Sequence, residues 1–72
     1  FQIVNLSQID SLGLKTIDAQ VLKDKGLIRS ALKPVKILGD GKLTAKVDVT
    51  ATEFSIQAEQ KIEKSGGTIS RL

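Results

Sequence analysis

The residues best suited to do chemistry are five cations gathered around a glycine-rich turn in the middle of the chain. Between positions 29 and 46 the only acidic residue is Asp40, and the basic residues are Arg29, Lys33, Lys36, Lys42 and Lys46. Lys and Arg beside a glycine turn can approach and neutralise the phosphates of a nucleic acid backbone. A solvated basic surface without any ligand is the alternative interpretation of the same residues.

The turn itself, GDGK at residues 39–42, resembles a phosphate-binding loop only in part. The first glycine of a Walker motif would fall at Lys36, and its Ser or Thr would fall at Leu43, so neither end of the pattern is met. Glycine is also the residue that tight turns require for backbone reasons alone. The motif therefore predicts a turn between two strands.

Groups that could support catalysis or bind a metal are scarce. The chain has no Cys and no His, so the commonest general base and the usual soft metal ligands are missing. Glu59 and Glu63 share a helix face, but like charges four residues apart on an exposed face are normally just solvated. Ser55 has no neighbouring base to activate it. We therefore expect no enzymatic activity, no cofactor, no metal and no small-molecule substrate.

Size and composition restrict the chain to one small domain, residues 1–72. The chain has 72 residues, of which 40% are hydrophobic and mostly aliphatic, with two Phe and no Trp or Tyr. The net charge of +3 is mildly basic and compatible with a polyanionic partner. No apolar run approaches the roughly 18 residues of a membrane helix, so no membrane association is expected. Because Met is absent and the chain starts at Phe1, we expect a domain from a longer protein.

Hydrophobic periodicity predicts strands that alternate with helices. Strands are predicted at residues 1–6, 35–38, 46–51 and 68–72. Helices are predicted as one turn that begins after Ser7 and ends at Gly13, then at 19–25 with Asp18 as its cap, and at 53–65 with Thr52 as its cap. The fold class is therefore α/β, with a small sheet of about four strands and two to three helices.

The last predicted helix carries an apolar stripe. Phe54, Ala58 and Ile62 follow one another at helical spacing and should face the core together. The pair Gly66-Gly67 should end this helix, and Ile69 of the following strand should point inward.

In this order and at these spacings, the residues resemble the family of large-subunit ribosomal protein fifteen. The resemblance is carried by KILGDGKL at 36–43, Val47-x-Val49, Phe54-Ser55 with Ala58 and Ile62, Gly66-Gly67, Asn5-Leu6 and the segment 22–28. It covers essentially the whole chain as the C-terminal globular domain of the family, with the fold of an L-fifteen/L-eighteen-e-like domain. The family's N-terminal arm, rich in Gly, Lys and Arg, is expected to be absent from this chain.

The resemblance implies a structural constituent of the large ribosomal subunit, in the cytoplasm or in an organellar matrix or stroma. Its partners would be large-subunit (23S-type) rRNA and neighbouring large-subunit ribosomal proteins. Members often carry basic residues on both sides of the Phe-Ser pair, whereas this chain has Thr50, Thr52, Glu53, Ile56 and Gln57 there. The rRNA contacts are therefore predicted at Arg29, Lys33, Lys36, Lys42, Lys46 and Arg71.

A protein-docking domain is the alternative from another functional class. It would use the helical face of the chain without binding RNA directly, and Ile56 and Leu72 are its candidate apolar contacts. An Ile56→Lys substitution would separate the two hypotheses, because a cation there would favour RNA and disfavour an apolar protein contact.

Overall fold

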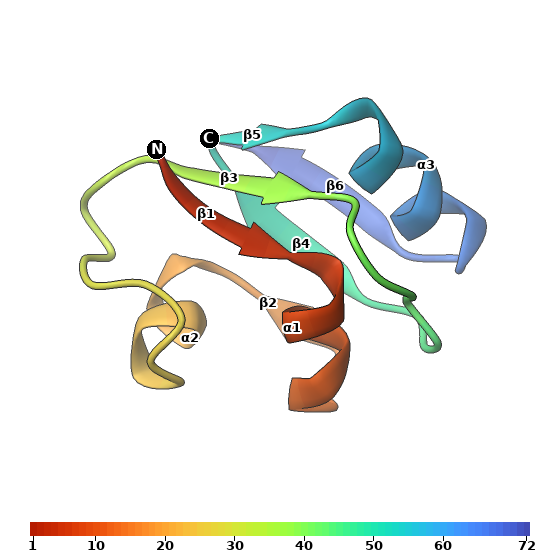
Figure 1. Ribbon diagram of the computed structural model, residues 1–72, viewed down its shortest axis with the longest axis horizontal. Helices are drawn as coiled ribbons and strands as arrows, with labels where there is room; N and C mark the ends of the chain where they lie inside the picture. Colours follow the sequence, from red (N-terminus) through yellow and green to blue (C-terminus); the bar gives the residue numbers. More distant parts are fainter.

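The computed structural model describes all 72 residues and arranges them around two small parallel sheets (Figure 1). The first sheet has the order β1-β3-β5, formed by Gln2–Asn5, Val35–Leu38 and Glu53–Phe54. The second has the order β2-β4-β6, formed by Thr16–Ile17, Asp48–Ala51 and Thr68–Arg71. The helices are α1 (Leu6–Leu12), α2 (Ala19–Asp24) and α3 (Ile56–Lys64).

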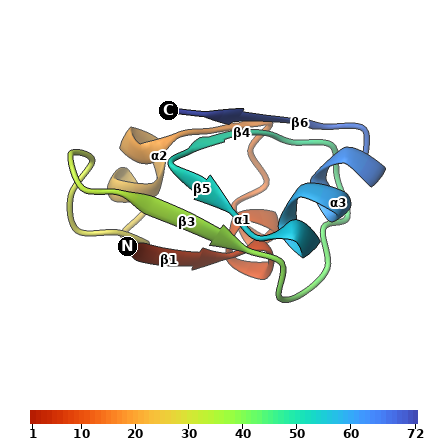
Figure 2. The same cartoon turned by 90° about the horizontal axis from the view of Figure 1, so that it is seen from above.

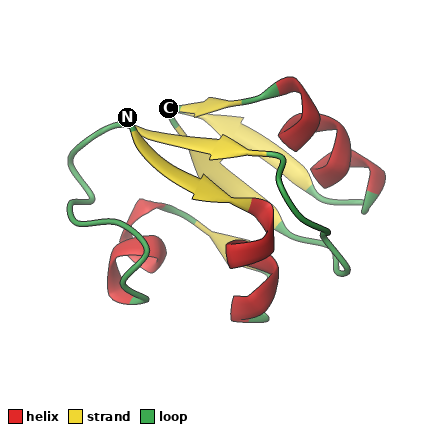
Figure 3. Cartoon of the chain, in the orientation of Figure 1, coloured by secondary structure: helices red, strands yellow, loops and turns green.

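The two sheets form separate layers when the molecule is seen from above (Figure 2). Each terminus belongs to a different layer, and both termini lie at the end of the molecule away from α3 (Figure 2). Helix α3 packs against β3 of one sheet and β6 of the other. Figure 3 shows α1 and α2 together on the opposite side of the strands from α3. The longest helix has only nine residues, and none could cross a lipid bilayer.

An entirely apolar core lies between the layers. Its 14 buried residues are aliphatic apart from Phe54, and no polar or charged residue is buried. In the first sheet the inward positions Val4, Ile37 and Phe54 lie in register on three adjacent strands. Strand β4 alternates as predicted, with Val49 and Ala51 buried. The period-two pattern of the sequence therefore identified the correct faces.

The α/β class is confirmed, but the strand count is higher than predicted. Six short strands form two sheets, where the sequence indicated about four strands in one. The missed strands are β2 and β5, which have two residues each. Two residues are too few to show a periodicity of two, so these strands exist only through their pairing with β4 and β3.

The predicted start of the last helix is wrong by three residues. The helix begins at Ile56 instead of residue 53, and its cap is Ser55, whose hydroxyl accepts a hydrogen bond from the Ala58 amide at 3.1 Å. Thr52, predicted as the cap, lies between β4 and β5, and its hydroxyl instead accepts a hydrogen bond from the Val35 amide of β3 at 3.0 Å. Phe54 is buried as predicted, but as a strand residue.

The first two helices are closer to prediction. Helix α1 begins at Leu6, with Asn5 as its cap in place of Ser7, and Gly13 ends it in the left-handed conformation. Asp18 caps α2 by accepting from the Val21 amide at 2.9 Å, as predicted. The Asp18 cap satisfies an amide that the first turn of a helix leaves without a partner, whereas at α1 the Gln8 side chain accepts from the Asn5 amide at 2.8 Å.

Candidate nucleic-acid interface

The turn Gly39–Gly41 is held between two helices. The Ser7 amide of α1 donates to the Asp40 carbonyl at 3.1 Å. From α3, the Lys61 ammonium donates to the Gly39 carbonyl at 2.6 Å and to the Gly41 carbonyl at 3.0 Å. All three carbonyls of the turn are therefore bound within the protein, and two of them by one lysine.

Glycine is needed in this turn because the helices come so close. A Cβ at Gly39 would lie 2.5 Å from the Gln57 Cβ and 2.8 Å from the Ala58 nitrogen, in the first turn of α3. A Cβ at Gly41 would collide with Ser7, and the φ of +90° there favours glycine in any case. The segment does connect two strands as predicted, but it opens the longer loop 39–47 between β3 and β4, and its glycines serve helix packing.

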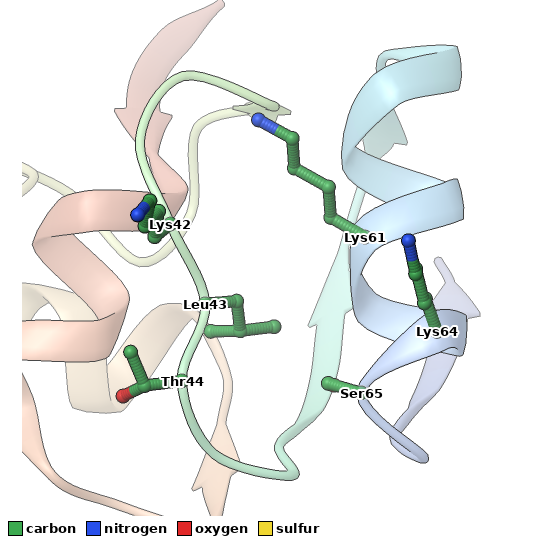
Figure 4. Close-up of a pocket in the computed structure, with 6 residues that line it drawn as sticks. All are labelled: Lys42, Leu43, Thr44, Lys61, Lys64 and Ser65. Atoms are coloured by element: carbon green, nitrogen blue, oxygen red, sulfur yellow. The ribbon is translucent and has the colours of Figure 1, made fainter.

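A lysine-lined hollow of about 320 Å³ lies between the segment after this turn and the end of α3. We call it the lysine hollow and define it by its lining residues, Lys42, Leu43, Thr44, Lys61, Lys64 and Ser65. Figure 4 shows Lys61 reaching from the helix toward the turn, while Leu43 extends from the loop toward the helix. No carboxylate is among the residues that line it.

Lys42 and Lys46, two of the predicted contact residues, lie on the loop between β3 and β4. Lys42 lines the lysine hollow. Lys46 lines a second hollow with Lys15 and Asp48. The Asp48 carboxylate there also accepts hydrogen bonds from the amide and hydroxyl of Thr68, at 3.2 and 3.0 Å.

Three other predicted residues lie along or before β3. Lys36 is on the outer face of β3, half-buried, in register with Ile3 and Glu53. Arg29 and Lys33 are exposed in the connector before β3. Gln2 fastens this connector, because its side-chain oxygen accepts from the Arg29 amide at 2.9 Å.

Arg71 is already engaged inside the protein. Its guanidinium forms ion pairs with Glu53, at 3.3 Å, and with Glu59. It also lies 5.6 Å from the centre of the Phe54 ring, in the range of a cation–π contact. Two carboxylates offset its charge, so Arg71 is the least suited of the six to hold a phosphate.

The predicted residues form two groups, since the four residues of β3 separate Arg29 and Lys33 from Lys42 and Lys46. At about 3.3 Å per residue, β3 is about 13 Å long, and the two groups lie beyond its opposite ends. Sequence reasoning missed Lys61 and Lys64, which join Lys42 at the lysine hollow. Their spacing of three residues in the last turn of α3 was the available signal.

These features define a small domain of the α/β class, in which two helices hold a glycine-rich turn in place. Residues 3–70 match the model of a protein family described as "Ribosomal proteins 50S-L15, 50S-L18e, 60S-L27A". The match spans nearly the whole chain, and the chain belongs to this family.

Similar proteins named large ribosomal subunit protein uL15 occur in several bacteria. The protein of Corynebacterium kroppenstedtii is 45% identical over 73 residues, covering 96% of this chain and 47% of the relative. That of Opitutus terrae is 46% identical over 67 residues, covering 90% of this chain and 45% of the relative. The chain thus spans about half the length of the curated relatives it matches.

Proposed function

We propose that this chain is a structural, non-enzymatic constituent of the large ribosomal subunit that binds large-subunit rRNA and supports subunit assembly. The main support for this proposal is that residues 3–70 match the model of a family described as ribosomal proteins. Its partners would be that rRNA and neighbouring ribosomal proteins. Its location would be the ribosome, in the cytoplasm or in an organellar matrix or stroma.

We also propose that residues 1–72 act as one globular domain, the C-terminal domain of a longer protein. A single core of 14 residues supports the first part, because it draws on both sheets and all three helices. The length of the relatives, about twice the matched region, supports the second.

Phosphate neutralisation is the mechanism that the surface supports best. Lys33, Lys36, Lys42 and Lys46 form no ion pair within the chain, because both ion pairs of the molecule belong to Arg71. Free ammonium groups on a folded scaffold displace the counterions of RNA without a large ordering cost. With no Trp or Tyr and only two Phe, the chain has little aromatic surface for stacking single-stranded bases, so contacts should go to the backbone.

The experiment is a titration of the 72-residue chain with protein-free large-subunit rRNA fragments over a range of salt concentrations. About 3–4 phosphate contacts, each of which adds roughly 0.7–0.9 to the slope, give a slope of log K against log salt of about −2.1 to −3.6. Small-subunit rRNA fragments of the same length are the control for non-specific attraction. Equal affinity for both RNAs would contradict a specific rRNA site, and binding with a slope near zero would contradict the phosphate mechanism.

The exposed side chain of Ile56 favours protein docking as a second candidate function. Ile56 opens α3 with 73% of its surface exposed, and Leu72 is 80% exposed. An Ile56→Lys substitution should leave rRNA binding unchanged or tighter, since it adds a cation to an exposed position. Weaker incorporation into large subunits with unchanged rRNA affinity would instead support a protein contact at this position.

A further inference from the structure

We infer that the lysine hollow holds one backbone phosphate of RNA, with Lys42 and Lys64 as its contacts and Lys61 as the residue that positions them. This inference rests on the proposed function and deepens it, because it assigns a contact to a specific place. The lysine hollow joins a loop to a helix that the sequence does not connect, and three of its six lining residues are lysines.

The ammonium groups of Lys42 and Lys64 are available. Neither forms a hydrogen bond or an ion pair with another residue of the chain, in contrast to Arg71. No carboxylate lines the hollow. Asp10 places one negative charge at its edge, where the carboxylate accepts from the Thr44 amide and hydroxyl, both at 2.9 Å, so one carboxylate stands against three lysines.

The charge balance favours an anion. The three lysines carry as much positive charge as the net charge of the whole chain, which is +3. The carboxyl end of α3 opposes them with the partial charge of a helix end, about −0.5. Lys15, Lys46 and Asp48 form the competing hollow, where a full negative charge offsets one of two lysines. The lysine hollow is therefore the stronger anion site of the two.

Lys61 ties the two sides of the hollow together. Its ammonium has three N–H donors, of which one serves the Gly39 carbonyl at 2.6 Å and another the Gly41 carbonyl at 3.0 Å. These bonds tie α3 to the turn directly before Lys42. Lys42, on the loop, and Lys64, in the last turn of α3, thereby line opposite sides of one hollow (Figure 4).

The lining points to a phosphate in preference to a base. Leu43 is its one apolar residue and no aromatic ring is present, so the hollow offers no platform for stacking. The hydroxyl hydrogens of Thr44 and Ser65 are committed, to Asp10 and to the Ile62 carbonyl at 2.7 Å. The free donors are thus ammonium groups, which bind phosphate as point charges.

The test compares Lys64→Ala with Lys23→Ala in the full 72-residue chain. Both lysines are exposed and lie in the last turn of a helix, so each variant removes one charge from a similar setting. The probe is protein-free large-subunit rRNA, titrated at several salt concentrations, with circular dichroism to confirm the fold of each variant. Lys42→Ala and the double variant Lys42→Ala/Lys64→Ala complete the set.

Lys64→Ala should remove one phosphate contact, which lowers the slope of log K against log salt by roughly 0.7–0.9. The ratio of wild-type to variant affinity should therefore fall about five- to eightfold for each tenfold rise in salt concentration. For the double variant this ratio should fall about 25- to 60-fold over the same rise in salt concentration, and for Lys23→Ala it should fall less than about twofold. Wild-type binding with equal slopes for Lys64→Ala and Lys23→Ala would overturn the phosphate site and leave rRNA binding standing. Absence of binding by the wild type would overturn both.

Discussion

Replacing Gly39 by alanine should destabilise the fold, because the added methyl group would collide with the first turn of α3. The new Cβ would lie 2.5 Å from the Gln57 Cβ and 2.8 Å from the Ala58 nitrogen, whereas unstrained carbon contacts are about 3.5–4.0 Å. Helix α3 is poorly placed to recede, since Ala58 is fully buried and Ser55 caps the first turn. The turn itself must move by about 1 Å, away from Lys61.

Overpacking of this kind costs about 1–3 kcal/mol, and backbone atoms among the obstacles place Gly39→Ala near the upper end. A chain of 72 residues has a free energy of unfolding of about 4–11 kcal/mol, at roughly 0.05–0.15 kcal/mol per residue. A loss of about 3 kcal/mol is therefore a large share of the total. It should lower Tm by about 12–24 °C, at about 4–8 °C per kcal/mol for a domain of this size.

The assay is thermal and urea unfolding followed by circular dichroism, with Gly13→Ala as the matched control. Gly13 has a φ of +66°, and a Cβ added there would meet no atom within 4 Å, so its substitution carries only the conformational cost, about 1–2 kcal/mol. Gly39 is not among the glycines with positive φ, so its cost is steric. If Gly39→Ala proves less destabilising than Gly13→Ala, the packing argument for the turn is refuted.

Three further predictions concern α3 and the turn. Ser55→Ala should lower the free energy of unfolding by about 1 kcal/mol, measured by urea unfolding, because the Ala58 amide loses its cap. Lys61→Met should cost about 1–2 kcal/mol for two partly exposed hydrogen bonds, and should speed exchange of the Ser7 amide, which donates to the Asp40 carbonyl of the turn; unchanged exchange there would count against a role of Lys61 in holding the turn. Asp40→Asn should tighten rRNA binding at low salt by removing a nearby negative charge, an advantage that should vanish near 1 M salt, where the Debye length is about 3 Å.

The sequence was informative wherever one residue type has one local use. Asp18 before an apolar run predicted a helix cap, and the alternation of Val47, Val49 and Ala51 predicted the buried face of β4. The start of α3 was mispredicted because Phe54 fits two patterns. It lies four residues before Ala58, as a helix stripe requires, but it pairs in register with Ile37 on β3.

The candidate site was less predictable because its parts come from different elements. The charge run around the turn identified Lys42, whereas Lys61 and Lys64 resembled ordinary solvated lysines near a helix end. Arg71 looked free in the sequence and proved to be paired with Glu53 and Glu59. Both outcomes depend on how α3 docks against the strands, which no local pattern specifies.

The packing role of the turn and its proposed binding role depend on the same two glycines. Without side chains at Gly39 and Gly41, α1 and α3 approach closely enough for Lys61 to reach both carbonyls. That approach also sets the width of the lysine hollow, since Lys42 follows the turn directly and Lys64 follows Lys61 by three residues. We expect a bulkier turn to move away from α3 and widen the hollow while the domain is still folded. Gly39→Ala should therefore weaken rRNA binding even at temperatures where the variant remains folded.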